Sequence, residues 1–461
     1  MEMAGGRDVE RAGLAQHRKP LAPVSTSLTP ADRDRYSHAN RMLSAVEPQK
    51  RTRACRVFPR RVLPLLALAM LVPGAAPFQA QSTPEVRALW VTRGSLTSPA
   101  SIAALVRSAR SSGFNTLLVQ VRGRGDAYFA GGLEPRAALL AAARPDFDPL
   151  HTVIAQAHAE GLRVHAWVNV NLVASANGLP AGRDHVIYRH PEWLMVPRAL
   201  SVELARAGSR SPVFLGRLAR WTRASPEVEG LFTSPILPEA AAHTVAVIDD
   251  LVARYPVDGL HLDYARYPGP DFDYSLGSLR AFREDLGPAL SEADRRRFDS
   301  RSVSDLIALT DLYPDRWAGF RRSRLNALVM RIRTAAKDRR PGIILSAAVF
   351  PDAAEAASRR FQDWRFWVEN RWLDVVCPMA YTSDRGVFDA QITSARMVAG
   401  TRPLWAGIGA YRLTASRTIE NIETARRLGA SGVILFSYDS LVQPPRGADT
   451  LASIGRAAFA P

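Results

Sequence analysis

Residues 258–268 read Asp-Gly-Leu-His-Leu-Asp-Tyr-Ala-Arg-Tyr-Pro. The first part of this stretch, Gly259–Tyr264, is short and largely apolar, which is typical of a buried β-strand. Side chains alternate along a strand, so His261 and Asp263 share one face while the two leucines share the other. We expect the leucines to pack against helices and the two polar side chains to point into a barrel, with Asp263 near its mouth.

Seven other segments resemble this strand, and amphipathic helical stretches separate them. The candidate strands in chain order are Val86–Thr92, Thr116–Arg122, Arg163–Asn169, Gly259–Tyr264, Ile343–Phe350, Val375–Tyr381, Leu404–Ala410 and Gly432–Tyr438. Short apolar strands that alternate with helices form parallel sheets, and eight such units predict an α/β fold, the (β/α)8 or TIM barrel. An open doubly wound sheet is the alternative, but no Gly-rich phosphate loop follows the first strand.

Two connections are much longer than the others. About 90 residues separate the third and fourth strands, and about 75 separate the fourth and fifth. In a barrel, the loops that follow the strands rise over the carboxyl-terminal face, where active sites lie. We therefore expect long loops after strands 3 and 4 to wall a cleft. An inserted subdomain is the alternative.

Composition excludes several classes of protein. Two cysteines in 461 residues cannot build a disulfide framework or a zinc ribbon, and 47% hydrophobic with 23% charged residues fits neither a disordered chain nor a polytopic membrane protein. The net charge of +16 is carried almost wholly by scattered arginines, so no nucleic-acid partner is expected. The nine histidines show no paired metal-ligand spacing, and we expect neither a metal nor another cofactor.

The N-terminal region differs from the rest of the chain. Residues 1–50 are polar and without apolar periodicity, which indicates a disordered or mis-assigned N-terminal extension. In 51–80, several arginines precede the apolar run Val62–Val72, and small residues follow it, as in a signal peptide. The sequence thus predicts an exported protein, periplasmic or secreted, whose barrel occupies 84–461. An uncleaved signal that anchors the chain is the alternative, and it would be the only membrane contact.

The stretch 258–268 resembles the DGIHLDYxRYP segment of the bacterial glycosyl hydrolase-like family 10, and six other pieces match that family in order. They are Arg87–Thr92, Asn115–Asp126, His165–Asn169, His190–Leu194, Pro378–Tyr381 and Gly432–Asp439. The resemblance covers roughly residues 84–445. It implies a (β/α)8 barrel, export to the cell envelope and hydrolysis of glycosidic bonds. At least one envelope member type acts on peptidoglycan glycan strands stripped of stem peptides.

The same stretch is also similar to the D-G-x-D-x-D-x-E strand of chitinases. In that pattern Asp258, His261 and Asp263 occupy the three aspartate positions, and Ala265 replaces the final acid. The chitinase mechanism therefore cannot be copied directly to this chain. A second carboxylate must come from another strand end, or the mechanism differs.

Glycoside hydrolysis usually needs two carboxyl groups, one to protonate the leaving oxygen and one to attack the sugar or activate water. Asp263, at the end of its strand, is the first candidate for a catalytic residue. Asp384, after the sixth strand, and Asp126, in a Gly-rich turn after the second, are the candidates for its partner. Asp439 ends the eighth strand and could instead bind sugar, and Glu134 lies further along the second loop.

The same rim should bind the sugar through aromatic faces and planar hydrogen-bonding groups. His261 lies deeper and is interpreted as a hydrogen-bonded core histidine. The candidate substrate-binding residues are Trp90, Arg122, Trp167, Asn169, Tyr264, Arg266, Tyr267, Tyr381, Trp405, Tyr438 and Asp439.

Two functions remain open at this point. The first is an exported glycoside hydrolase that cleaves O-glycosidic bonds of a bacterial envelope polysaccharide, with peptidoglycan glycan strands as a candidate substrate. The second is a catalytically inactive barrel that binds glycans or scaffolds the cell envelope. The carboxylates and aromatics at predicted strand ends favour the first, and the missing strand-four acid favours the second. The sugar, the linkage, the stereochemical course and the oligomeric state stay open.

Overall fold

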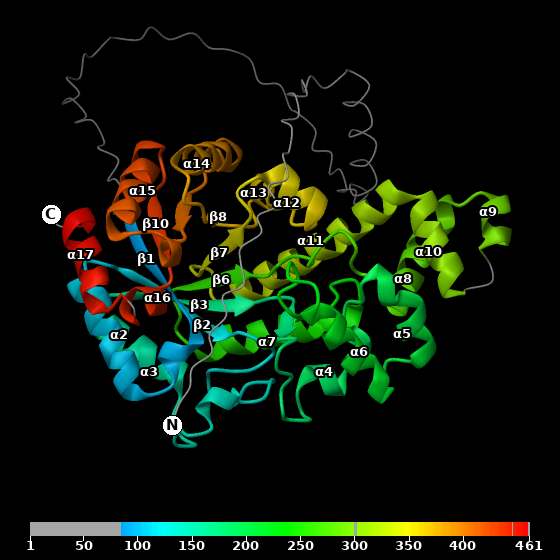
Figure 1. The fold of residues 1–461 in the computed structure, drawn as a ribbon, viewed down its shortest axis with the longest axis horizontal. Coiled ribbons are helices and arrows are strands. Elements are labelled where there is room, and N and C mark those ends of the chain that lie inside the picture. Colours follow the sequence, from blue (N-terminus) through cyan, green and yellow to red (C-terminus); the bar gives the residue numbers. More distant parts are fainter. Residues whose placement is uncertain (1–83, 299–301, 445, 460–461) are drawn as a thin grey trace, which may run out of the picture. The chain divides into compact units, whose positions relative to one another are not determined.

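The computed structural model describes residues 84–298, 302–444 and 446–459 (Figure 1). The predicted N-terminal extension (1–50) and signal peptide (51–80) lie outside these described residues. Within the described residues, no helix is both long enough and apolar enough to cross a membrane.

Eight parallel strands close into a barrel, as the sequence predicts (Figure 1). Each strand pairs with the next one along the barrel, and the first strand pairs with the last, Val86 lying opposite Gly432. Predicted and observed strands differ only by a few residues at their ends. The barrel strands are β1 (Val86–Val91), β2 (Thr116–Arg122), β3 (Arg163–Asn169), β6 (Gly259–Asp263), β7 (Ile344–Val349), β8 (Val375–Ala380), β9 (Trp405–Ile408) and β10 (Gly432–Phe436).

Helices follow each strand and cover the outside of the barrel. Their starts are set by local hydrogen bonds: Ser98 and Ser101 form a reciprocal capping box before α2, and Asp148 caps α3. The covering helices are α2 (Pro99–Ser111), α3 (Pro149–Ala159), α7 (Pro238–Arg254), α11 (Pro314–Arg339), α12 (Ala353–Arg359), α13 (Trp364–Glu369), α14 (Arg385–Ala399), α15 (Ala415–Arg427), α16 (Tyr438–Val442) and α17 (Ala448–Phe459).

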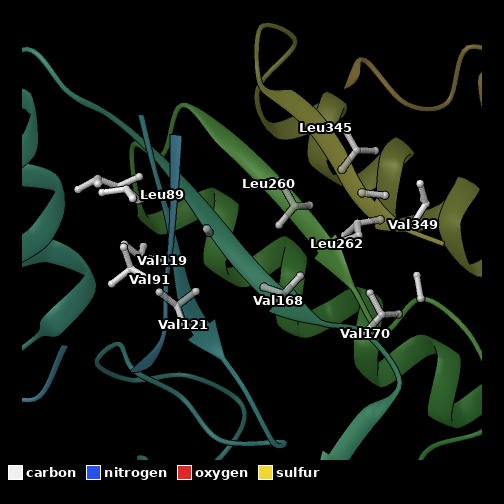
Figure 2. Packing of buried hydrophobic residues seen from close by; sticks show 14 of the residues in the cluster. Leu89, Val91, Val119, Val121, Val168, Val170, Leu260, Leu262, Leu345 and Val349 are labelled. Atoms are coloured by element: carbon white, nitrogen blue, oxygen red, sulfur yellow. The ribbon is translucent and has the colours of Figure 1, made fainter. Parts of the chain in front are cut away.

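The outward-facing strand residues form the main core. Leu260 and Leu262 are fully buried in the layer between the barrel and its helices, alongside apolar residues of β1, β2, β3 and β7 (Figure 2). Complete burial of a leucine side chain stabilises a fold by about 1.5–3 kcal/mol. This arrangement confirms the predicted orientation of the strand, and it directs His261 and Asp263 to the barrel interior.

Both long connections fold into small units with cores of their own. Between β3 and β6, the ribbon β4 (Leu172–Ala174) and β5 (Leu231–Phe232) packs with α4 (Val186–Arg189), α5 (Ser201–Ala207) and α6 (Pro212–Arg223). Between β6 and β7, α8 (Leu276–Leu286), α9 (Glu292–Arg297) and α10 (Val303–Leu312) precede α11, and α8 and α10 pack against its start.

These two units contact each other through α5 and α10, and they belong to the same compact body as the barrel. The predicted long connections after the third and fourth strands are therefore present. Each has a small core of its own, as the alternative of an inserted subdomain implied, but neither separates from the barrel.

Short 3-10 turns complete the described chain: η2 (Arg93–Leu96), η3 (Ala138–Leu140), η4 (Pro191–Trp193), η5 (Arg198–Leu200), η6 (Gly287–Ala289) and η7 (Ala410–Arg412).

Candidate active site

A cavity of about 430 Å³ opens at the carboxyl-terminal end of the barrel, and we call it the mouth cavity. Its walls come mainly from strand ends and the turns that follow them, so residues far apart in sequence meet there because the strands are parallel. The lining residues are Trp90, Thr92, Arg93, Gly94, Gln120, Arg124, Leu139, Trp167, Asn169, Leu172, Asp263, Tyr264, Arg266, Ala348, Met379, Tyr381 and Phe436.

Asp263 is the last residue of β6 and lines this cavity, with 9% of its surface exposed. Its Oδ1 accepts a hydrogen bond from the backbone N–H of Tyr264 at 2.7 Å. Burial raises the pKa of the Asp263 carboxyl to about 6, although the nearby positive charge of Arg266 acts in the opposite direction. The carboxyl group can therefore hold a proton in mildly acidic solution.

The residues after Asp263 turn sharply out of the strand. Tyr264 has a φ of 50°, a left-handed conformation that is costly for a bulky side chain and is found where function requires it. Arg266 does not pair with Asp263 in the described structure; it forms an ion pair of 2.7 Å with Glu229. The Arg266 guanidinium also lies 4.5 Å from the centre of the Tyr264 ring. Asp263 therefore keeps its carboxyl group available to the cavity.

His261 is a buried core residue, as interpreted from the sequence. Trp90 donates its indole N–H to His261 Nε2 at 3.0 Å, and His261 Nδ1 lies 2.9 Å from the Ser346 hydroxyl. Because an indole N–H can only donate, Nε2 is the unprotonated nitrogen and Nδ1–H donates to Ser346. Burial lowers the pKa of His261 to about 3, so the ring stays neutral and holds Trp90 in place.

Aromatic side chains form the walls above this layer. The Trp90 and Tyr381 rings meet edge to face at 6.1 Å, and Tyr381 stacks on Phe436 at 5.5 Å. Trp167 donates its indole N–H to Asn169 Oδ1 at 3.0 Å. The Asn169 side-chain amide donates in turn to the backbone carbonyl of Gly123, in the turn after β2. Of the predicted substrate-binding residues, the structure brings six to the mouth cavity: Trp90, Trp167, Asn169, Tyr264, Arg266 and Tyr381.

Besides Asp439, whose contacts are described below with the other carboxylates, four predicted substrate-binding residues lie elsewhere. Trp405 begins β9 and borders a cavity at the opposite, amino-terminal end of the barrel. Tyr267 is fully buried against Phe361, and Tyr438 is buried in α16 within the outer core. Arg122 is 1% exposed, with its guanidinium held inside the protein. These positions correct the expectation that the four side chains meet sugar at the rim.

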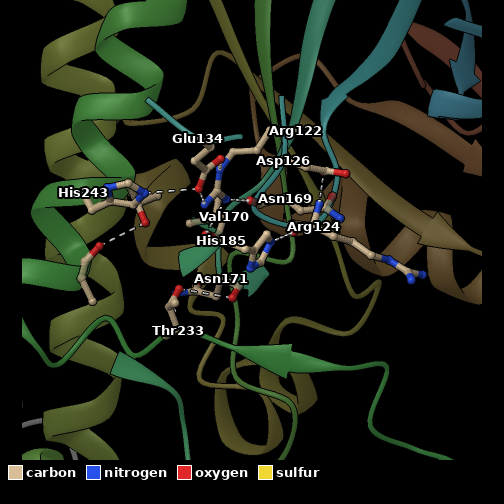
Figure 3. Close-up of polar contacts among 12 residues, drawn as sticks. Arg122, Arg124, Asp126, Glu134, Asn169, Val170, Asn171, His185, Thr233 and His243 are labelled. Carbon is tan, nitrogen blue, oxygen red and sulfur yellow. Dashed lines mark hydrogen bonds and ion pairs between the residues drawn. The ribbon is translucent and has the colours of Figure 1, made fainter. Parts of the chain in front are cut away.

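Arg122 is the centre of a buried polar network beneath the mouth cavity (Figure 3). Its Nε and Nη2 atoms bind the two Glu134 oxygens at 2.7 and 2.6 Å, and its Nη1 binds the backbone carbonyls of Asn169 and Val170. Burial alone would raise the pKa of Glu134, but Arg122 and a hydrogen bond from His243 outweigh it and lower the pKa to about 2. The network fixes the end of β3, and thus Asn169, against the loop after β2.

The other predicted carboxylates have structural contacts and do not line the mouth cavity. Asp384 is exposed and caps α14, accepting the backbone N–H of Val387 at 2.8 Å. Asp126 accepts the backbone N–H of Arg124 at 2.9 Å. Asp439 accepts the backbone N–H of Thr92 at 2.8 Å and the Ser95 hydroxyl at 2.7 Å. The structure thus does not bring Asp384 or Asp126 beside Asp263 as a second carboxyl group.

Several residues of the site were not predicted from the sequence. Arg93, Gln120, Arg124 and Phe436 all line the cavity from strand ends, so the rule that found Asp263 could have found them. Glu229 lies in the long connection between β3 and β6, two residues before β5 begins, and no motif in the sequence marks it. Among the residues described, no group of three or more His, Cys, Asp or Glu side chains is arranged to hold a metal ion.

Comparison with known proteins agrees with this architecture. The family model of glycosyl hydrolase-like 10 matches residues 85–420, which is most of the chain. The chain belongs to this family. Glycosyl hydrolase YngK of Bacillus subtilis (strain 168) is 23% identical over 345 residues, which cover 67% of this chain and 57% of YngK. Glycosyl hydrolase DigH of Escherichia coli (strain K12) is 25% identical over 290 residues, which cover 58% of this chain and 55% of DigH.

The matched part therefore spans little more than half the length of these curated relatives. Among solved structures, the glycoside hydrolase domain of PgaB (BpsB) from Bordetella bronchiseptica is similar, with a TM-score of 0.57 and 14% identity. The match covers 82% of this chain and 100% of that domain. At this identity the likeness concerns the fold, a barrel that glycosidases use.

Proposed function

We propose that this protein is a glycoside hydrolase that cleaves O-glycosidic bonds at the mouth cavity, with Asp263 as its proton donor. One observation carries the proposal: a buried carboxyl group with a pKa raised to about 6 lies at the end of a barrel strand, inside an aromatic-walled cavity. Trp90, Trp167 and Tyr381 offer apolar faces that suit the C–H faces of sugar rings. Membership of a glycosyl hydrolase-like family supports the same conclusion.

Asp263 would act as the general acid. In its protonated form it gives its proton to the glycosidic oxygen while the bond from that oxygen to the anomeric carbon breaks, and the bonding electrons stay with the leaving oxygen. A carboxyl group with a pKa near 6 suits this role, because enough of it is protonated below neutral pH and its conjugate base is weak enough to release the proton.

Glu229 is our candidate for the second carboxyl group. Its oxygen lies 2.7 Å from Arg266, which lines the cavity, and its negative charge contributes to the raised pKa of Asp263. A side chain at the next residue, Gly230, would meet the Ala174 carbonyl at 2.1 Å, so the chain is packed tightly onto β4 there. Glu229 is thus placed by the β4–β5 ribbon, and as a base it would take a proton from the water that attacks the anomeric carbon.

The pH dependence of kcat/KM tests the role of Asp263. The protonated carboxyl is the active form, and its pKa in the free protein is about 6. We therefore expect kcat/KM to fall by about tenfold for each pH unit above about 6, as the loss of a single proton requires. A profile of hydrolysis rates from pH 4 to 9 measures this, and a kcat/KM that stays level from pH 5 to 8 would argue against Asp263 as the acid.

Replacing Glu229 by glutamine tests the second carboxyl group. We expect Glu229→Gln to lower kcat by about 10²-fold or more, because an amide cannot take a proton from water. Glu227→Gln is the matched control, since Glu227 is an exposed carboxylate two residues away in the same loop. Equal kcat values for the two variants would remove Glu229 from the mechanism and leave the role of Asp263 intact.

The substrate we propose is a bacterial envelope polysaccharide, with peptidoglycan glycan strands as the first one to test, and the protein would be exported to reach it. The basic and apolar character of residues 51–80 supports export. Fractionation of cells that express the full chain, followed by N-terminal sequencing of the mature protein, tests this. Recovery of the uncut chain from the cytoplasm would contradict it.

A second function, glycan binding without hydrolysis, is favoured by two observations. Among the residues that line the mouth cavity, Asp263 is the sole carboxylate, and Ala265 stands where the related chitinase pattern has its acid. A purified protein that binds glycan strands and releases no product would select this second function.

A further inference from the structure

The mouth cavity contains more positive than negative side chains. Three arginines line it, and one of them, Arg266, is neutralised by its ion pair with Glu229. The other two, Arg93 and Arg124, form no ion pair with a carboxylate in the described part of the chain. A partly buried guanidinium without a counter-charge is unusual, because its desolvation is not offset inside the protein.

Both arginines are held in place by fixed backbone turns. Arg93 follows β1, in a turn that Asp439 holds through the backbone N–H of Thr92. Arg124 follows β2, in a turn closed by the hydrogen bond from its own backbone N–H to Asp126. Since β1 and β2 are neighbours in the barrel, the two turns lie side by side at the rim.

The guanidinium groups form no hydrogen bond with a charged group among the described residues, although the negative charge of Asp126 acts on Arg124 from nearby. Arg93 Nη1 donates to the amide oxygen of Gln120 at 3.1 Å. It also lies against Gly123, where an added side-chain carbon would be 2.4 Å from Nη1. Arg124 makes no side-chain hydrogen bond with any other described residue, and Figure 3 shows its side chain extending away from Asp126.

The two positive charges also act on each other. Burial, and next to it the positive charge of Arg93, lower the pKa of Arg124, and the negative charge of Asp126 offsets this only in part. An anion between them would relieve this repulsion, and a carboxylate matches the planar fork of a guanidinium group. Asp263 lines the same cavity, so such an anion would be bound near the scissile bond.

We propose that Arg93 and Arg124 form a carboxylate-binding subsite, and that the protein therefore selects glycans that carry an acidic group next to the cleaved linkage. This inference rests on the proposed function, since it names the class of substrate for the same cavity. The carboxylate can belong to a lactyl ether on an amino sugar or to a uronic acid, because both present the same group to the arginines.

Calorimetric binding tests the subsite separately from catalysis. The full chain carries Asp263→Asn, which slows turnover so that binding can be measured. Three ligands are compared: peptidoglycan glycan strands with free lactyl carboxylates, the same strands as methyl esters, and hyaluronan oligosaccharides as the uronic acid source. We expect the Kd for at least one acidic glycan to be about tenfold or more lower than for the ester, and this difference to shrink at high salt.

When Arg124→Gln is added to the Asp263→Asn chain, the Kd for the acidic glycan should rise to that for the ester. The Kd for the ester should stay unchanged. Arg107→Gln is the matched control, because Arg107 is an exposed arginine of α2. Equal affinity for acidic glycans and the ester, or an equal loss for both with Arg124→Gln, would overturn the subsite. Hydrolysis of esterified and free strands at equal rates by the unmodified protein would also overturn it, while leaving the proposed function standing. Selective binding without hydrolysis of any glycan would retain the subsite and reject the proposed function.

Discussion

Replacing Asp263 by asparagine is expected to lower kcat/KM for glycan hydrolysis by about 10²–10⁴-fold, because it removes the proton donor and keeps the shape of the side chain. Asp263 is buried at the end of β6, and its carboxyl group faces the mouth cavity without an ion pair among the described residues. An amide at this position cannot supply the proton, and it introduces no new buried charge. The variant should therefore fold and bind glycan normally.

Asp384→Asn provides the control for this experiment. Asp384 is exposed and caps α14, and asparagine caps helices as well as aspartate does. We expect kcat/KM of this variant to match that of the unmodified protein. If Asp384→Asn abolished hydrolysis and Asp263→Asn lost less than about tenfold, the catalytic carboxyl group would be misassigned. Circular dichroism and thermal unfolding of both variants would establish that they are folded.

Replacing Glu134 by glutamine is expected to lower the free energy of unfolding by about 3–5 kcal/mol, because it leaves the buried Arg122 guanidinium without its counter-charge. The pair is 1% and 2% exposed, and its two hydrogen bonds are 2.7 and 2.6 Å long (Figure 3). Urea denaturation measures the loss. The control is Asp146→Asn, which breaks the highly exposed Arg144–Asp146 pair and should leave the unfolding midpoint unchanged.

The same ion pair makes a pH-dependent contribution to stability. The pKa of Glu134 is about 2 in the folded protein, below its ordinary value of 4.5. The folded state therefore binds the Glu134 proton less tightly than the unfolded state, and the contribution is present above pH 4.5 and lost as the pH falls toward 2. Glu134→Gln should remove this part of the acid sensitivity. If Glu134→Gln and the unmodified protein had equal free energies of unfolding at pH 7, the buried pair would contribute no net stability.

The fold could be predicted because its signal is local and repeated. Each strand is a short apolar run between helices, and the alternation of Leu260 and Leu262 with His261 and Asp263 defines both faces of β6. The boundaries of the long connections could not be predicted in the same way. The ribbon of β4 and β5 is held by contacts between residues about 60 positions apart, and such pairings leave no periodicity in the sequence.

The site was only partly predictable because the end of a strand is not the same as the rim of a cavity. Trp405 lies at the start of its strand, so its ring points to the opposite end of the barrel. Tyr267 and Tyr438 follow their strands but turn beneath the covering helices. Asp384 and Asp439 are recruited by nearby backbone N–H groups, which a carboxylate can bind wherever a helix or turn begins.

The most direct test of hydrolysis measures the release of new reducing ends from peptidoglycan glycan strands stripped of stem peptides. The strands are incubated with the purified full-length chain, and mass spectrometry identifies the products. If Asp263 is the proton donor of a glycoside hydrolase, the unmodified protein produces shortened strands, with one water added for each bond cleaved. Asp263→Asn then produces them at least about 100-fold more slowly while still binding the strands. If both proteins bind the strands and neither releases a product, the barrel is a glycan-binding protein and the claim of hydrolysis is wrong.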